Sequence, residues 1–113
     1  MSNPRTSFLD FVLERWCAFI AAPQFGDVEY SVNLDRGIGK MGIEFWCETY
    51  VGLVGAWENG RCLDIDVLRL ENNSASMLSA GPCAQDSDVD VRVAALEKLL
   101  AHARRGSSPR LNR

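Results

Sequence analysis

Carboxylates on a predicted strand are the first residues whose type and spacing could do chemistry. Asp64 and Asp66 are two positions apart, so on a strand both side chains point to one side, and Glu44 falls on that side too. Paired carboxylates can bind a metal ion or act as general acid and base. A catalytic carboxylate usually also needs a pocket and a partner such as histidine, lysine or a metal. The sequence therefore favours a solvated acidic face over a catalytic one.

The thiols and the single imidazole form the next group of candidates. Cys17, Cys47, Cys62 and Cys83 include no C-x-x-C pair, and His102 is the only histidine. A zinc site of the usual kind needs clustered Cys and His ligands, so we expect no metal centre. An even count leaves disulfides open, but buried free thiols are favoured in a cytoplasmic chain. His102 is expected in the last turn of a helix, where it complements the helix dipole.

A glycine-rich run matches the G-x-G-x-x-G pattern of dinucleotide-binding loops. The run is Gly37-Ile38-Gly39-Lys40-Met41-Gly42, and it leads into a predicted strand. A dinucleotide site needs a strand before the glycines and a helix after them, whose N-terminus holds the pyrophosphate. We therefore interpret this run as a loop and expect no cofactor. The chain also lacks a G-x-S-x-G elbow and an H-E-x-x-H motif, so we expect that it is not an enzyme.

Two helices frame the chain in this reading. Apolar residues recur at helical spacing from Leu9 to Ile20, with Asn3 as a candidate cap and Pro4 at the first helical position. A second apolar stripe runs from Val89 to Ala103, and Gly106 is expected to end that helix. Its predicted capping pair is Ser87 and Asp90.

The segment between the helices predicts strands. Apolar and polar residues alternate there, and strands are expected at residues 28–32, 41–48, 50–57 and 62–70, with a weaker fifth at 76–80. We predict an α+β fold, in which an antiparallel four- to five-stranded meander sheet has the N- and C-terminal helices packed on one face. A single domain is expected over residues 1–105, followed by a flexible basic tail over 106–113.

Two tight turns set the register of the central strands. Asn59-Gly60 is a preferred two-residue type I′ turn and pairs Trp57 with Cys62, while a turn at Glu48-Thr49 pairs Trp46 with Val51. Side chains alternate between faces, so both registers must sort residues in the same way, and they do. One face is almost wholly apolar and is expected to lie under the helices. The opposite face combines large apolar residues with carboxylates, which is typical of protein interfaces. The residues expected to bind a partner on it are Glu44, Trp46, Glu48, Leu53, Trp57, Asp64 and Asp66. A covering layer from the C-terminal helix or from residues 71–86 is the alternative.

Charge is distributed unevenly along the chain. Twelve basic and fifteen acidic residues give a net charge of −3. Residues 26–90 sum to −8 (four basic, twelve acidic), and residues 91–113 sum to +5 (six basic, one acidic). An acidic central block repels phosphates, so nucleic acid is not an expected partner. No stretch is long and apolar enough for a membrane span or a signal peptide, so we expect a cytoplasmic protein without a membrane partner.

The central hairpin resembles a known family of bacterial proteins. Gly42-Ile43-Glu44-Phe45 and the run from Tyr50 to Val67, with Trp57-Glu58-Asn59-Gly60 at its turn, look like the core of the TriTu family of immunity proteins. The resemblance is close over residues 40–70 and extends to the helix–sheet layout over 1–105. It implies a small cytoplasmic protein that binds and neutralises a cognate toxin from a polymorphic toxin system. The family does not indicate which residues bind the toxin.

The alternative function is that of a small acidic secretion chaperone that binds an effector segment as a dimer. The chain is expected to be a monomer as an immunity protein and a homodimer as a chaperone.

Overall fold

A computed structural model describes residues 7–71 and 74–107 of the chain. The elements follow one another as two helices that enclose a run of strands, with a short 3-10 helix after the first. Their bounds are α1 (Phe8–Ile20), η1 (Pro23–Phe25), β1 (Glu29–Asp35), β2 (Lys40–Trp46), β3 (Tyr50–Trp57), β4 (Cys62–Arg69), β5 (Ser74–Ser79) and α2 (Asp86–Ser107).

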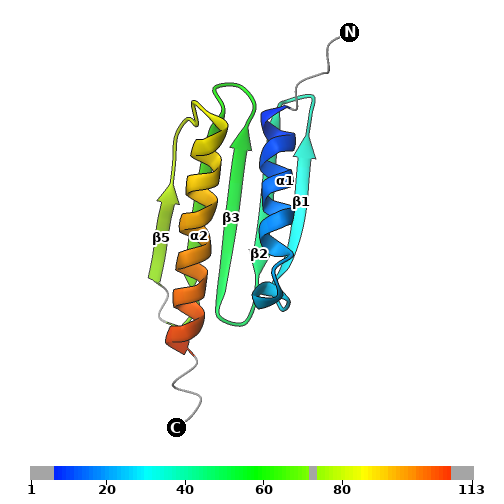
Figure 1. Cartoon of the computed structure of the whole chain (residues 1–113). Helices are drawn as coiled ribbons and strands as arrows, with labels where there is room; N and C mark the ends of the chain where they lie inside the picture. Colours follow the sequence, from blue (N-terminus) through cyan, green and yellow to red (C-terminus); the bar gives the residue numbers. More distant parts are fainter. Residues whose placement is uncertain (1–6, 72–73, 108–113) are drawn as a thin grey trace.

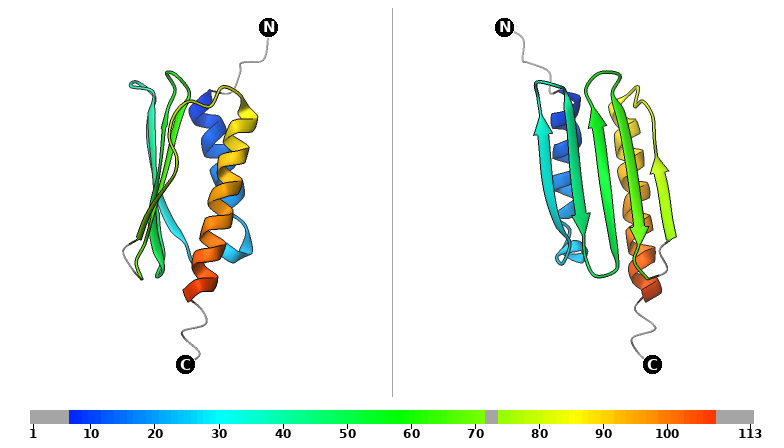
Figure 2. Two further views of the ribbon diagram at one scale, coloured as in Figure 1. Left: turned by 90° about the vertical axis from the view of Figure 1, so that its left-hand side faces the viewer. Right: turned by 180° about the vertical axis from the view of Figure 1, so that it is seen from behind.

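The five strands form one antiparallel sheet in which sequence neighbours are also neighbours in space. The strand order is β1-β2-β3-β4-β5, a meander without crossovers. Both helices lie on the same face of this sheet, with α1 beside β1 and β2 and α2 nearer β5 (Figure 1). The side view in Figure 2 shows two layers, helices on one side and bare strands on the other. The predicted α+β meander with both helices on one face is therefore confirmed.

The strand register agrees with the register derived from the turns. Trp57 pairs with Cys62 and Trp46 pairs with Val51, as predicted. The β3–β4 turn itself differs from the prediction, because a type I′ turn places positive φ at both Asn59 and Gly60. Here the positive φ values fall on Gly60 (82°) and Arg61 (49°). The prediction of a type I′ turn is thus wrong, although the register that it implied is correct.

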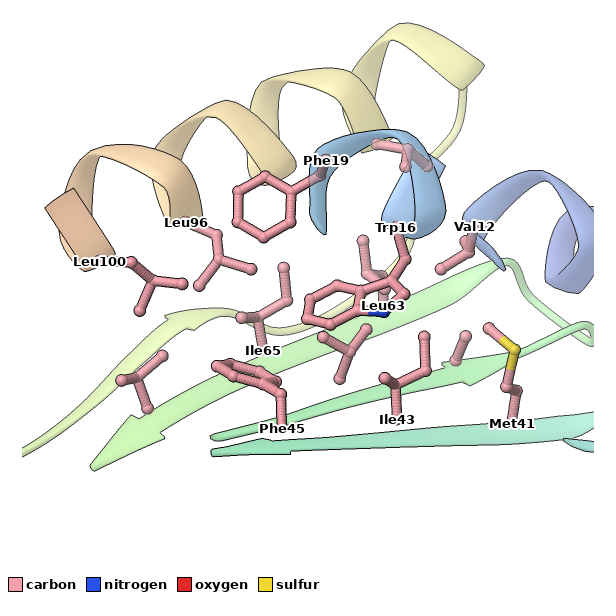
Figure 3. Close-up of a cluster of buried hydrophobic side chains, with 14 of the residues drawn as sticks. Val12, Trp16, Phe19, Met41, Ile43, Phe45, Leu63, Ile65, Leu96 and Leu100 are labelled. Atoms are coloured by element: carbon pink, nitrogen blue, oxygen red, sulfur yellow. The ribbon is translucent and has the colours of Figure 1, made fainter. Parts of the chain in front are cut away.

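The core lies between the helices and the inner face of the sheet, which we define as the face that the helices cover. Trp16 of α1 contacts Phe45 of β2 (ring centroids 5.1 Å apart) and Phe19 (5.4 Å). Leu96 and Leu100 bring α2 to the same cluster, as Figure 3 shows. Among the inner-face residues predicted to be covered, Cys47 and Gly52 are half-buried. The others are buried: Met41, Ile43, Phe45, Tyr50, Val54, Ala56, Leu63, Ile65 and Val67.

Gly52 makes room for one of the core aromatic rings. An ideal Cβ built on Gly52 would lie 2.1 Å from Cζ of Phe45, its cross-strand partner, and 2.6 Å from Cε1 and Cε2. These distances are far below van der Waals contact, so the phenyl ring lies directly on the backbone of Gly52. The glycine at this position therefore allows Phe45 to lie flat against the sheet beneath Trp16.

The N-terminus of α1 is capped by the β3–β4 turn as well as by its own preceding residue. Ser7 is the N-cap, and its Oγ accepts a hydrogen bond from Asp10 N (3.1 Å). The carboxylate of Glu58 accepts two more, from Phe8 N (3.0 Å) and Leu9 N (3.1 Å). A carboxylate at this position also interacts favourably with the helix dipole. The cap predicted at Asn3, with Pro4 after it, lies outside the described residues.

The start of α2 is held by a different pair from the predicted one. The Asp88 carboxylate accepts a hydrogen bond from Gln85 N (2.9 Å), just before the first helical residue, Asp86. The predicted capping pair of Ser87 and Asp90 is therefore wrong, because the helix begins one residue earlier than Ser87. Arg61 of the β3–β4 turn donates to Asp86 (2.7 Å) and to Cys83 O (2.8 Å), so this turn positions both helices. At its other end α2 extends to Ser107, past the stop predicted at Gly106.

The four cysteines are free thiols, as predicted, but they differ in burial. Cys83 is buried, and this burial raises the pKa of its thiol. Cys47 and Cys62 are half-buried, and Cys17 is exposed on α1. The expectation that all four are buried is therefore wrong, because α1 points Cys17 away from the core and Cys62 lies on the uncovered side of the sheet.

Candidate functional site

The candidate site is the face of the sheet that the helices leave bare, here called the outer face. The view from behind in Figure 2 looks onto it, and no described element covers β1 to β4 on that side. The alternative of a covering layer from α2 is therefore wrong, because α2 packs on the inner face. Strand alternation and the register place these residues of β1 to β4 on the outer face: Glu29, Ser31, Asn33, Asp35, Lys40, Gly42, Glu44, Trp46, Val51, Leu53, Gly55, Trp57, Cys62, Asp64, Asp66 and Leu68.

The structure brings six of the seven predicted site residues onto this face. Trp46 is 37% exposed and Leu53 is 43% exposed, both high values for such large apolar side chains. Glu44 is also exposed, and Trp57, Asp64 and Asp66 are half-buried. Glu48 lies in the turn between β2 and β3, beyond the end of the ladder, and is exposed there. It borders the outer face rather than forming part of it.

A trench crosses the middle of the outer face. Gly42 and Gly55 are direct cross-strand partners, so two adjacent positions of the sheet carry no side chain. Leu53 rises on one side of these glycines and Trp57 on the other, and the resulting depression has a volume of about 500 Å³. We call Gly42, Gly55 and these two walls the glycine trench. At Gly42 its floor is backbone, so an incoming side chain can approach the strand closely there, whereas Gly55 is buried under the Trp57 indole.

Trp57 contacts two neighbouring residues on this face. Its indole reaches back over Gly55, where an added Cβ would lie 3.2 Å from Cη2 of the ring. The Nζ atom of Lys40 lies 5.7 Å from the ring centroid, at the outer limit of a cation–π contact. A second depression of about 500 Å³ lies on the other side of the indole, bordered by Asn59, Cys62 and Asp64. Trp57 is thus a fixed ridge between two hollows.

The charge of the outer face is strongly negative. Five carboxylates (Glu29, Asp35, Glu44, Asp64 and Asp66) face one ammonium group (Lys40), which makes a net charge of −4. The ion pairs formed among the described residues involve other carboxylates: Asp10, Glu71, Asp86 and Asp90. The negative charge of the outer face is therefore left largely to be neutralised by solvent ions or by a partner.

Asp64 also holds part of the fold. Its Oδ1 accepts a hydrogen bond from Gly81 N (3.3 Å), and Gly81 O accepts one from Leu63 N (2.9 Å). Arg92 of α2 donates to Gly81 O (3.0 Å) and to Pro82 O (3.0 Å) from the helical side. A substitution at Asp64 would therefore disturb the segment that leads to α2, so Asp66 is the better residue for testing the surface alone.

The groups on the outer face are carboxylates, one ammonium group, two indoles and a few small or aliphatic side chains. Among the described residues, no group of three or more histidine, cysteine, aspartate or glutamate side chains could hold a metal ion. Within that same part of the chain, no helix is long and apolar enough to cross a membrane. The G-x-G-x-x-G run forms most of the β1–β2 turn and the start of β2, and no helix follows it, in agreement with the loop interpretation. His102 belongs to α2, which packs on the inner face (Figure 1), whereas strand alternation places Asp64 and Asp66 on the outer face.

The glycine trench and its neighbours were missed by the sequence reasoning. The register that pairs Ile43 with Val54 also pairs Gly42 with Gly55, so the signal was present in the alternation of the two strands. Ile38, in the β1–β2 turn, is 74% exposed and borders both hollows, and only the folded turn brings it next to Trp57.

Comparisons of this chain with protein-family models, with curated proteins and with solved structures find no match.

Proposed function

We propose that this chain is an immunity protein, which neutralises a cognate bacterial toxin by binding it through the outer face. The observation that carries this proposal is the bare outer face, where Trp46, Leu53 and Trp57 lie among carboxylates instead of a polar, solvated surface. Antiparallel sheets that face water on one side normally alternate apolar and polar residues cleanly. Exposed aromatic residues within a charged rim are the composition of binding hot spots.

The geometry supports recognition of a protein with a basic surface. A net charge of −4 on one face speeds the approach of a positively charged partner and orients it. Trp57 is already held in place by Gly55 and Lys40, so little side-chain entropy is lost when a partner covers it. The glycine trench offers space for one side chain of the partner beside it. Toxins that cleave nucleic acids or nucleotides have basic active sites and fit this description.

The resemblance to the TriTu family supports the more specific part of the proposal. The Trp57-Glu58-Asn59-Gly60 segment, on which the resemblance depends, links the two layers of the fold. Trp57 lies on the outer face, whereas Glu58 caps α1 on the inner side. A Trp-Glu pair at a hairpin turn therefore has a physical role in this chain, independent of the family.

The test is coexpression of the chain with the product of the neighbouring reading frame, followed by copurification and calorimetry. We expect a stable complex and rescue of growth when that product is toxic. Trp57→Ala should weaken binding by more than roughly tenfold, as hot-spot truncations do. Asp66→Lys should slow association and reduce its dependence on salt.

A matched control separates the surface from overall charge. Glu14→Lys makes the same change of charge on the exposed side of α1, on the other side of the molecule. It should leave the affinity unchanged. If Glu14→Lys weakened binding as much as Asp66→Lys, the outer face would not be the binding surface. A stable dimer in light scattering, with no binding to the neighbouring product, would favour the secretion chaperone instead.

A further inference from the structure

β1 is an edge strand of the sheet, and the register shows which of its backbone N–H and C=O groups point toward β2 and which point away from the sheet. Cys47 N donates to Tyr50 O, so the odd-numbered residues of β2 bond to β3 and the even-numbered ones to β1. The β1–β2 register pairs even positions of β2 with odd positions of β1, such as Glu44 with Ser31. The N–H and C=O groups of Tyr30, Val32 and Leu34 therefore point away from the sheet.

The same three residues also turn apolar side chains toward the inner face. Tyr30 is 41% exposed and Val32 is 38% exposed, because α1 covers them only partly. Tyr30 makes an edge contact with Trp16, with ring centroids 5.5 Å apart. The apolar layer thus continues to the open edge and stops there without a covering neighbour among the described residues.

Helix α1 adds a second apolar wall beside this edge. Asp10 forms a two-pronged ion pair with Arg36, which directly follows β1 (3.0 and 2.6 Å). On a helix, Leu13, Cys17 and Ile20 lie on the same side as Asp10, so they too face toward β1. The opposite side of the helix faces α2, where Arg15 pairs with Asp90. An added strand would therefore find backbone partners on β1 and apolar side chains from both elements.

Charge limits what such a strand can carry on its outer side. Glu29 and Asp35 stand at the two ends of β1 on the outer face, and Glu44 lies one strand further in. We propose that the β1 edge binds an extended segment of a partner protein by strand addition. This segment has apolar residues opposite Tyr30, Val32 and Leu34, and basic residues opposite Glu29 and Asp35. The inference adds a second surface to the proposed function and does not depend on the identity of the partner.

A second copy of the chain is disfavoured as the occupant. Antiparallel pairing of two β1 strands about Val32 would place Glu29 of each copy directly opposite Asp35 of the other. Like charges in directly opposed positions destabilise a strand pair. Such a pairing would also join two outer faces that each carry a net charge of −4. The basic, alternating segment removes both sources of repulsion.

The test uses the peptide Arg-Val-Thr-Val-Thr-Val-Arg, whose sequence reads the same in both directions, so that strand orientation need not be known. It is titrated into the ¹⁵N-labelled full chain and followed by NMR. We expect saturable shifts on the amides of β1 and on Leu13 and Ile20. Val32→Pro removes an outward N–H without breaking a bond to β2, and should weaken binding roughly tenfold relative to Val32→Ala.

The controls decide between strand addition and other modes. A peptide of the same composition, Val-Val-Val-Arg-Arg-Thr-Thr, should not bind. If Val32→Pro does not fold, Glu29→Arg provides the second test. This variant should bind Arg-Val-Thr-Val-Thr-Val-Arg more weakly, and should bind Glu-Val-Thr-Val-Thr-Val-Glu more strongly, than the parent chain does. Equal binding of the scrambled peptide, or shifts confined to Leu53 and Trp57, would overturn the proposal. So would a concentration-dependent dimer that Val32→Pro abolishes.

Discussion

The two glycines at positions 42 and 52 allow one substitution to be tested on opposite faces of the same strand pair. Gly52→Ala places a Cβ 2.1 Å from Cζ of Phe45, so the ring must move by more than ~1 Å to reach normal contact distance. That ring is packed against Trp16 at 5.1 Å and Tyr50 at 6.2 Å between centroids. Overpacking of this kind costs about 3 kcal/mol, and replacement of a strand glycine by alanine returns about 0.5–1 kcal/mol. We expect a net loss of about 2–3 kcal/mol.

Gly42→Ala makes the same chemical change in open space. Its Cβ would lie 4.0 Å from Cδ1 of Leu53, an ordinary contact. We expect this variant to be as stable as the parent or more stable by about 0.5 kcal/mol, because only the backbone effect remains. The two variants should then differ by about 3 kcal/mol in urea unfolding followed by tryptophan fluorescence. For a chain of this size, the difference corresponds to roughly 10 °C in Tm.

Phe45→Leu provides the internal check on this reasoning. If the clash with Phe45 causes the loss, the smaller side chain should relieve it, and the double variant should show a coupling free energy of about 2 kcal/mol. Stabilities of Gly52→Ala and Gly42→Ala within 1 kcal/mol of each other would refute the argument. So would additive effects in the double variant, because they would show that the ring and the glycine do not compete for the same space.

Three further predictions concern side chains that hold the helices to the sheet. Glu58→Ala should lower the free energy of unfolding by about 2 kcal/mol, and Glu58→Gln by about half of that. The reason is that the glutamine amide keeps one acceptor for α1 but has no charge. Equal losses for the two variants in calorimetry would contradict a cap that depends on charge. Hydrogen bonds from Arg36 and Ser7 lower the pKa of Asp10 from 3.8 to about 2. The folded state therefore binds fewer protons there than the unfolded state, and the associated stability is present above about pH 4 and is lost as the pH falls toward 2. Asp10→Asn should make the free energy of unfolding in urea depend less on pH between about pH 2 and 4. An unchanged dependence would show that Asp10 is not the group responsible. Arg92 donates to the carbonyl oxygens of Leu63, Gly81 and Pro82. Arg92→Met removes this donor and should lower the free energy of unfolding in urea by about 2–3 kcal/mol. A loss below about 0.5 kcal/mol would show that water replaces the guanidinium group.

The fold and the two faces of the sheet could be predicted because both depend on local pattern. Alternation fixes which side chains share a face, and a short turn sets the register of its two strands, so Trp46 and Trp57 were placed correctly on one face. The register survives the wrong turn type, because the observed loop of residues 58–61 has the same centre as the predicted two-residue turn at Asn59-Gly60. Gly60 and Arg61 carry the positive φ values instead of Asn59, and the contacts of Arg61 with Cys83 and Asp86 accompany this geometry.

What could not be predicted depends on contacts between distant residues. Glu58 caps α1 across a separation of 50 residues, so no local motif announces it. The second role of Asp64, as acceptor for Gly81, likewise requires the path of the chain after β5. The start of α2 differs by only two residues from the predicted one, yet this moves the capping pair from Ser87 and Asp90 to Gln85 and Asp88. Local rules therefore located the surface but not the side chains that support it.

The cap that Glu58 supplies to α1 also bears on synthesis of the chain. Phe8 and Glu58 are 50 residues apart, and translation at ~5–20 residues per second separates them by roughly 3–10 s. Because the chain leaves the ribosome in sequence order, α1 emerges before the strands that cover its apolar stripe and before the carboxylate that caps its first turn. Nascent α1 therefore lacks its cap until the β3–β4 turn has also emerged.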